Sequence, residues 1–107
     1  MKEYKNINKI IDQILEDSKA IDVIKINLSK KSSLCDYFYI TNGTSSRHVK
    51  SIADHIVKAF KELGMHSVST EGDNANNWIV IDLGSVVIHI FQKEAREKYR
   101  LEDIWKS

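Results

Sequence analysis

The chain has 107 residues and a mass of 12.3 kDa, so we expect residues 1–107 to form one domain around one modest core. Its composition, 42% hydrophobic and 29% charged, argues against disorder, and a net charge of +1 does not favour a dedicated DNA- or RNA-binding protein. The one cysteine cannot form an intrachain disulfide, and no stretch resembles a signal core or a membrane span. These features predict a soluble, cytoplasmic protein with no membrane or DNA partner.

Periodicity predicts a helix and then two strands in the first part of the chain. Within residues 4–18 the apolar residues recur at helical spacing and form one stripe, which comprises Ile7, Ile10, Ile11, Ile14 and Leu15. Residues 24–28 alternate between apolar and polar side chains, as in a strand that is buried on one face. Residues 36–41 are rich in aromatic and β-branched side chains and predict a second strand.

A second helix is predicted to follow residues 43–46, whose Gly-Thr-Ser-Ser sequence offers N-cap side chains. Its predicted buried stripe comprises Val49, Ile52, Ala53, Ile56, Val57, Phe60 and Leu63. Gly64 stands where a residue of left-handed conformation would end the helix.

The rest of the chain predicts three strands and a short helix. A weaker strand covers residues 66–70, two stronger strands cover 78–83 and 86–91, and Gly84-Ser85 fits a type II′ hairpin turn between them. Residues 94–105 are charged and helical in pattern. The element order αββαβββα predicts an α/β domain with a five-stranded mixed sheet and helices mainly on one face.

The two faces of the predicted hairpin differ in character. One face is aliphatic and comprises Ile79, Ile81, Leu83, Val86, Ile88 and Ile90. The other face sets Trp78 opposite Phe91, Val80 opposite His89, and Asp82 opposite Val87. This mixture of large aromatic, acidic and imidazole side chains is typical of an interface, so we expect the second face to bind a partner. Alternatively, the last helix folds back over it through Leu101, Ile104 and Trp105.

Several segments, taken together and in order, resemble the ribosomal silencing factor (Iojap-like) family over residues 7–105. They are Asp36-Tyr37-Phe38-Tyr39-Ile40, Gly43-Thr44-Ser45-Ser46-Arg47, Glu71-Gly72, Trp78-Ile79-Val80-Ile81-Asp82, His89-Ile90-Phe91, and the run from Arg96 to Trp105. The resemblance rests on the ordered set at matching spacing, because no single motif is specific.

The resemblance implies a translation repressor, active under nutrient limitation and in stationary phase, rather than an enzyme. It would bind the large ribosomal subunit through universal ribosomal protein L-fourteen and sterically block joining of the small subunit, with ribosomal RNA as a possible minor contact. The resemblance further implies a fold of nucleotidyltransferase-related topology, a homodimer when free, and no cofactor. One difference is Tyr39, where an aliphatic residue is usual in the family, and Tyr37 points to the same side. We therefore expect a more aromatic partner face.

The candidate partner-binding residues come from four segments. They are Trp78, Val80, Asp82, His89 and Phe91 of the hairpin, Tyr37 and Tyr39 of the second strand, Glu71, and Arg96 and Tyr99 of the last helix. Each has a structural alternative. Trp78 could seal the sheet edge, Asp82 and His89 could satisfy one another across the hairpin, and Glu71 could belong to a turn that begins the loop into the hairpin. Arg96 and Tyr99 could lie on a solvated helix face.

Two other functions stay open. Residues 43–46 could hold a phosphate in a nucleotidyltransferase-like enzyme, but that chemistry needs two or three carboxylates for Mg²⁺, and the following helix offers only one aspartate, Asp54. Helix capping explains this turn better. The histidines show no metal-ligand spacing, so we expect no metal site.

Besides the translation repressor and the nucleotidyltransferase-like enzyme, the third possible function is a homodimeric scaffold that does not bind the ribosome.

Overall fold

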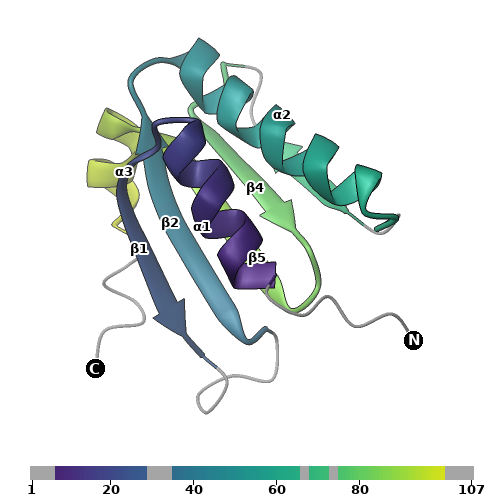
Figure 1. The fold of residues 1–107 in the computed structure, drawn as a ribbon. Helices are drawn as coiled ribbons and strands as arrows, with labels where there is room; N and C mark the ends of the chain where they lie inside the picture. The colour runs from purple at the N-terminus through teal and green to yellow at the C-terminus, as the bar shows by residue number, and fades with distance from the viewer. Residues whose placement is uncertain (1–6, 29–34, 66–67, 73–74, 101–107) are drawn as a thin grey trace.

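The computed structural model describes residues 7–28, 35–65, 68–72 and 75–100, with three helices and five strands (Figure 1). In chain order these elements are α1 (Ile7–Asp17), β1 (Ile21–Asn27), β2 (Tyr37–Gly43), α2 (Ser46–Glu62), β3 (Ser69–Gly72), β4 (Trp78–Asp82), β5 (Val86–Gln92) and α3 (Lys93–Tyr99). The predicted order of elements is confirmed. No helix among these residues is both long and apolar enough to cross a membrane.

The two long helices form where apolar periodicity and capping coincide. The Ser45 hydroxyl accepts a hydrogen bond of 3.1 Å from the backbone N–H of His48, which satisfies a free donor at the start of α2. Gly64 has φ = 90°, the left-handed conformation expected just after the helix. The prediction that Leu63 is buried is wrong, because this side chain is 44% exposed at the end of the helix.

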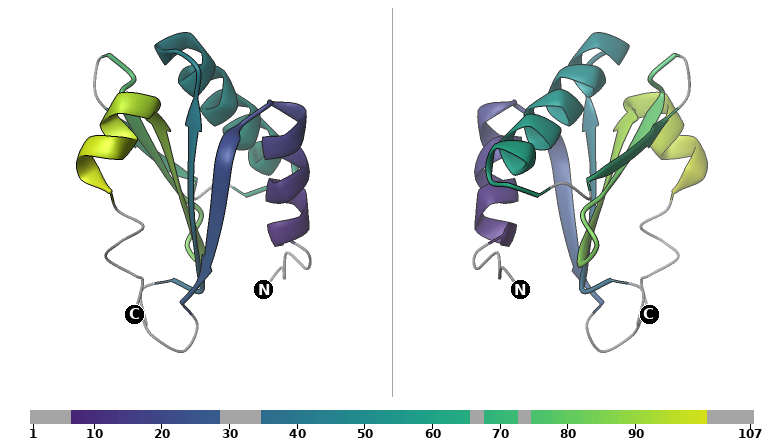
Figure 2. Two further views of the ribbon diagram at one scale, coloured as in Figure 1. Left: turned by 90° about the vertical axis from the view of Figure 1, so that its left-hand side faces the viewer. Right: turned by 90° about the vertical axis from the view of Figure 1, so that its right-hand side faces the viewer.

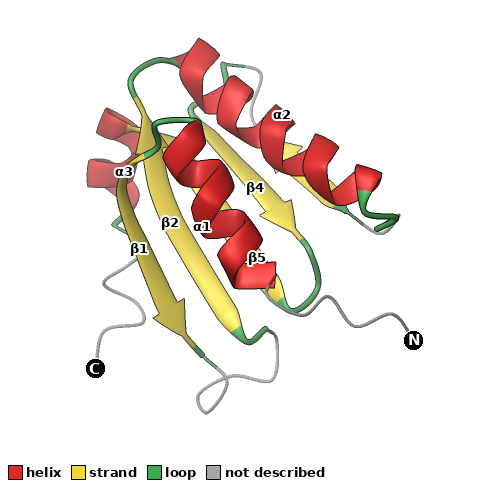
Figure 3. Ribbon diagram, viewed as in Figure 1, coloured by secondary structure: helices red, strands yellow, loops and turns green. Residues whose placement is uncertain are grey.

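The strands form one mixed sheet in the order β1-β2-β5-β4-β3 (Figure 3). The central pair, β2 and β5, is parallel, and the other three pairs are antiparallel. The long α2 connection carries the chain from β2 past two strand positions to the far edge at β3. The last hairpin therefore lies between β2 and β3.

The register of the β4–β5 hairpin is as predicted. Trp78 pairs with Phe91, Val80 with His89, and Asp82 with Val87. The backbone N–H of Leu83 donates to the carbonyl of Val86 at 2.9 Å, and Gly84 has φ = 89°. A positive φ at this position is readily adopted only by glycine in a two-residue turn, so the turn and the register are set together.

The helices cover the two faces of the sheet unequally, since α1 and α2 pack on one face and α3 lies on the other (Figure 2). The aliphatic face of the hairpin lies under α1 and α2, as predicted. A second, smaller cluster forms on the α3 side and comprises Leu28, Cys35, Phe38, Ile40 and Phe91, with Ile26, Trp78, Val87 and Ala95 packed against it.

Two predicted boundaries need correction. The third strand is β3 (Ser69–Gly72), so Glu71 and Gly72 do not begin a loop but pair with Val80 and Ile79 of β4. The last helix ends at Tyr99, because Arg100 adopts the left-handed conformation with φ = 49° as its C-cap. The proposed fold-back through Leu101, Ile104 and Trp105 lies outside the described residues.

Candidate functional site

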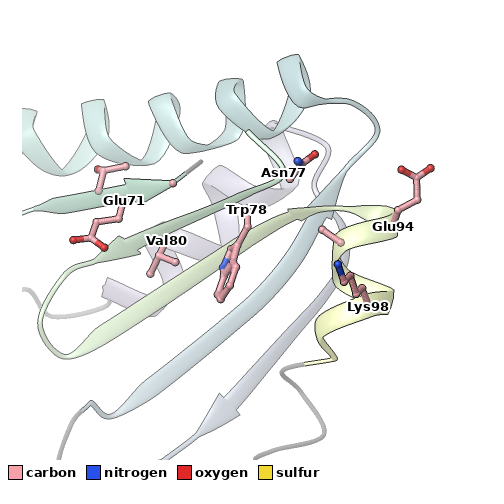
Figure 4. A pocket seen from close by; sticks show the side chains of 9 residues that line it. Glu71, Asn77, Trp78, Val80, Glu94 and Lys98 are labelled. Carbon is pink, nitrogen blue, oxygen red and sulfur yellow. The ribbon is translucent and has the colours of Figure 1, made fainter. Parts of the chain in front are cut away.

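A groove of about 910 Å³ lies between β3, β4 and α3, on the side of the sheet away from α1 and α2 (Figure 4). Its lining residues are Thr70, Glu71, Gly72, Asn77, Trp78, Val80, Glu94, Ala95 and Lys98. Glu71 and Val80 lie on one side of Trp78, and Glu94 and Lys98 of α3 lie on the other (Figure 4). The structure therefore brings together three predicted partner residues, namely Glu71, Trp78 and Val80.

The sequence prediction missed the α3 wall of the groove, which Glu94, Ala95 and Lys98 form. A signal was present in the hairpin register. Because Trp78 pairs with Phe91 and α3 begins two residues after Phe91, the first turn of α3 has to lie near Trp78.

Trp78 is half-buried and held by two neighbours. Its indole Nε1–H donates a hydrogen bond of 2.9 Å to Nδ1 of His89. Its ring also stacks on Phe91, with centroids 5.1 Å apart and planes 22° apart. A tryptophan that both donates a hydrogen bond and stacks on a neighbouring ring has a defined orientation before any partner binds.

His89 supports the groove from behind rather than lining it. The residue is 8% exposed and its ring lies 4.4 Å from that of Phe38, centroid to centroid. Burial lowers the pKa of His89 to about 4, so the imidazole is neutral at pH 7. The Nδ1 atom of His89 is not free to contact a partner, because it accepts a hydrogen bond from Trp78 inside the cluster.

One alternative predicted a hydrogen bond between Asp82 and His89, and this prediction is wrong. Instead Oδ1 of Asp82 accepts a hydrogen bond of 2.8 Å from the backbone N–H of Gly84. Asp82 is exposed at the end of β4 and is outside the residues that line the groove. Its observed role is to brace the hairpin turn.

The prediction that Phe91 contacts a partner is also wrong, because its side chain is fully buried. It packs in the α3-side cluster with Phe38 and Ile40 of β2, two residues that the sequence prediction missed. The alternation of β2 was the available signal, because Phe38 and Ile40 lie on the opposite face from the two tyrosines.

Tyr37 and Tyr39 lie on the wrong face for the predicted interface. Tyr39 pairs with Ile88 in the parallel β2–β5 register, which places both residues on the face covered by α1 and α2. The Tyr39 hydroxyl donates to Oδ1 of Asp12 in α1 at 2.9 Å. Burial, with the Asp12 carboxylate beside it, raises the pKa of Tyr39 well above its usual value. These tyrosines contribute to the core and not to the groove.

Arg96 does not lie on a solvated helix face, and it is outside the residues that line the groove. It is 9% exposed, and its Nη1 donates a hydrogen bond of 2.7 Å to Oδ1 of Asn42 in β2. This contact attaches α3 to the sheet. Tyr99 is the last residue of α3, and its side chain lies outside the described part of the structure.

Two backbone groups of the turn over residues 43–46 are hydrogen-bonded to residues of α2. The backbone N–H of Thr44 donates to Nδ1 of His48 at 2.9 Å, and that of Val49 donates to the Ser45 carbonyl at 2.9 Å. A Cβ on Gly43 would lie 3.0 Å from the backbone nitrogen of Val49, so the turn is also tightly packed. Among the described residues, no group of three His, Cys, Asp or Glu side chains could hold a metal ion.

Comparison with known proteins gives the same family along nearly the whole chain. The family model described as "Ribosomal silencing factor during starvation" matches residues 2–107. Ribosomal silencing factor RsfS of Haemophilus influenzae is 40% identical over 93 residues, which cover 87% of this chain and 91% of that protein. RsfS of Bacillus subtilis is 36% identical over 101 residues, which cover 94% and 86% of the two chains.

A eukaryotic protein and a solved structure extend the comparison. The mouse protein "Mitochondrial assembly of ribosomal large subunit protein 1" is 38% identical over 95 residues, which cover 86% of this chain and 42% of that protein. A crystal structure from Chromobacterium violaceum superposes with a TM-score of 0.89 at 34% identity, covering 97% of this chain and 87% of that one.

Proposed function

Because the chain belongs to the ribosomal silencing factor family, we propose that it lowers translation by binding the large ribosomal subunit and preventing the small subunit from joining. The name of the mouse relative refers to assembly of the ribosomal large subunit, which supports that subunit as the partner. Universal ribosomal protein L-fourteen is the contact that the family resemblance implies. The proposed activity is binding, without catalysis or a cofactor.

The observation that carries this proposal is the pre-oriented Trp78 in the groove beside α3. Its half-buried ring is held by His89 and Phe91, while Val80 next to it is also only partly buried. Tryptophan is enriched among the residues that dominate binding energy at protein interfaces, particularly in pockets that exclude water. Rigid presentation also lowers the entropy lost on binding. The groove therefore has the properties of an anchor site for a protein partner.

The proposed mechanism is steric exclusion. A domain seated by this groove on the joining surface of the large subunit would occupy area that the small subunit needs. Subunit joining would then fall by mass action as the concentration of the silencing protein rises. No conformational change in either ribosomal subunit is required.

Sedimentation of ribosomal subunits tests this proposal. The wild-type protein should travel with isolated large subunits and reduce the amount of joined ribosomes, whereas Trp78→Asp should do neither. Leu63→Asp is a matched control, because it also introduces an aspartate at a partly exposed apolar residue but lies at the end of α2, away from the groove. Circular dichroism establishes that both variants are folded.

The results distinguish the translation repressor from the homodimeric scaffold and the nucleotidyltransferase-like enzyme. Wild-type protein that does not co-sediment with large subunits would contradict the proposal. If Trp78→Asp instead converted a free dimer to a monomer without changing any ribosome profile, the groove would serve a homodimeric scaffold. Tight, Mg²⁺-dependent binding of a nucleotide would favour the nucleotidyltransferase-like enzyme.

A further inference from the structure

We infer that His89 is a positioning residue that orients Trp78 so that the groove offers the face and edge of the indole ring, and not its N–H group, to the partner. The inference about the indole stands on the structure alone, and its consequence for binding rests on the proposed function. It specifies which chemistry the partner brings to Trp78: a group that packs on an aromatic ring, and not an acceptor that hydrogen-bonds to the indole nitrogen.

The first step is the rigidity of His89. It lies on β5, between β2 and β4, so neighbouring strands flank it on both sides. Its ring is packed between Phe38, at a centroid distance of 4.4 Å, and Trp78, at 5.6 Å. Packing from two sides restricts the ring plane, and the hydrogen bond from Trp78 fixes which edge of the ring faces the indole, so Nδ1 is a fixed acceptor.

The second step is the direction of the hydrogen bond. Indole nitrogen is a donor only, so Nδ1 of His89 accepts and carries no proton, and the imidazole proton is on Nε2. The two residues are diagonal neighbours across the β4–β5 pair, because His89 pairs directly with Val80 and Trp78 with Phe91. The bond therefore fixes the rotation of the indole relative to the sheet, while Phe91 supports the ring by stacking.

The third step concerns what is left for a partner. The 2.9 Å bond to His89 uses the only N–H group of the indole. An acceptor on the partner would have to break this internal bond to reach the nitrogen. The ring itself remains partly exposed in the groove. Recognition at Trp78 is thus by packing.

The test compares two replacements of His89. His89→Leu removes the acceptor, whereas His89→Asn can place Oδ1 near the position of Nδ1. In ¹H–¹⁵N spectra, the indole N–H signal of Trp78 is identified by its loss in Trp78→Phe. We expect His89→Leu to shift this signal and to accelerate its hydrogen exchange, and His89→Asn to restore both toward the wild type.

Affinity for large subunits is the second readout. The loss of one hydrogen bond that orients the anchor predicts binding about fivefold to tenfold weaker in His89→Leu, with partial recovery in His89→Asn. In the Trp78→Phe background, where no indole N–H exists, His89→Leu should change the affinity by less than about twofold. An equal loss in both backgrounds would overturn the positioning role.

A measurement on the wild-type protein keeps the inference testable if the variants do not fold. Two-bond ¹H–¹⁵N correlations at pH 7 should show His89 protonated at Nε2 and unprotonated at Nδ1. The opposite tautomer would overturn the inference. Wild-type protein with the expected tautomer and no affinity for large subunits would contradict the proposed function and leave the orientation of Trp78 intact.

Discussion

Arg96 and Asn42, which are 54 positions apart in the chain, meet through a hydrogen bond of 2.7 Å between the guanidinium Nη1 and the amide Oδ1. Both residues are buried. Since Arg96 lies on the same short helix as Glu94, Ala95 and Lys98, this bond helps to hold one wall of the groove against the sheet.

Replacing Arg96 with Met should therefore destabilise the protein and loosen this wall. The substitution keeps most of the side-chain volume but leaves Oδ1 of Asn42 without its charged donor, at a cost of about 2 kcal/mol in the free energy of unfolding. Urea denaturation measures the change. Glu97→Gln, at an exposed position of the same helix, should change stability by less than about 0.5 kcal/mol. Equal midpoints for the two variants would contradict a structural role for Arg96.

Stability should depend on pH through His89. The pKa is about 4 in the folded protein and about 6.5 in the unfolded chain, so between these values the unfolded state binds the extra proton. The free energy of unfolding should thus rise with pH from 4 to 6.5 and gain no more from His89 above that range. The contribution is about 3 kcal/mol. Denaturation curves of the wild type and His89→Asn across this range isolate it, and parallel pH profiles would contradict the prediction.

Tyr39→Phe should lower stability without affecting the ribosome. The substitution removes the 2.9 Å hydrogen bond to Asp12 between β2 and α1, which contributes about 1 kcal/mol. Because Tyr39 lies on the face covered by α1 and α2, co-sedimentation with large subunits should equal that of the wild type. A folded Tyr39→Phe protein that no longer bound large subunits would place the interface on the other side of the sheet.

Two substitutions of Asp82 should differ in their effect on the hairpin. Asp82→Asn retains an Oδ1 acceptor for the N–H of Gly84, so stability and binding to large subunits should stay near wild-type values. Asp82→Ala removes this acceptor and should cost about 1 kcal/mol. Thermal unfolding and co-sedimentation distinguish the two roles. A loss of binding in Asp82→Asn would show that the negative charge itself contacts the partner.

The parts of the fold that depend on local pattern could be predicted from the sequence. The stripe of α1, the Ser45 cap and the Gly84-Ser85 turn each act within a few residues, and the turn alone determines which residues of β4 and β5 face each other. The strand order could not be predicted in this way. It depends on the pairing of β2 with β5, which are more than 40 residues apart, and no turn connects them.

The errors at the candidate site have the same origin. Alternation shows that Tyr37 and Tyr39 share a face, but only the register with β5 shows that this is the face under α1 and α2. Likewise, the hairpin pattern places Trp78, His89 and Phe91 on one face without revealing that Phe38, Ile40 and α3 bury the latter two. Trp78 and Val80 stayed accessible because they lie farther from β2, toward the β3 edge.

The position of β5 in the sheet has a consequence for synthesis of the protein itself. Residues up to 82 can form the β1–β2 and β3–β4 pairs, but these two pairs join only when β5 enters between them. Folding of the nascent chain must therefore wait until residues 86–92 have left the exit tunnel. The same strand supplies His89 and Phe91, so a prematurely terminated copy that ends before β5 cannot hold Trp78 in place. Competence to bind therefore requires β5 to have joined the sheet.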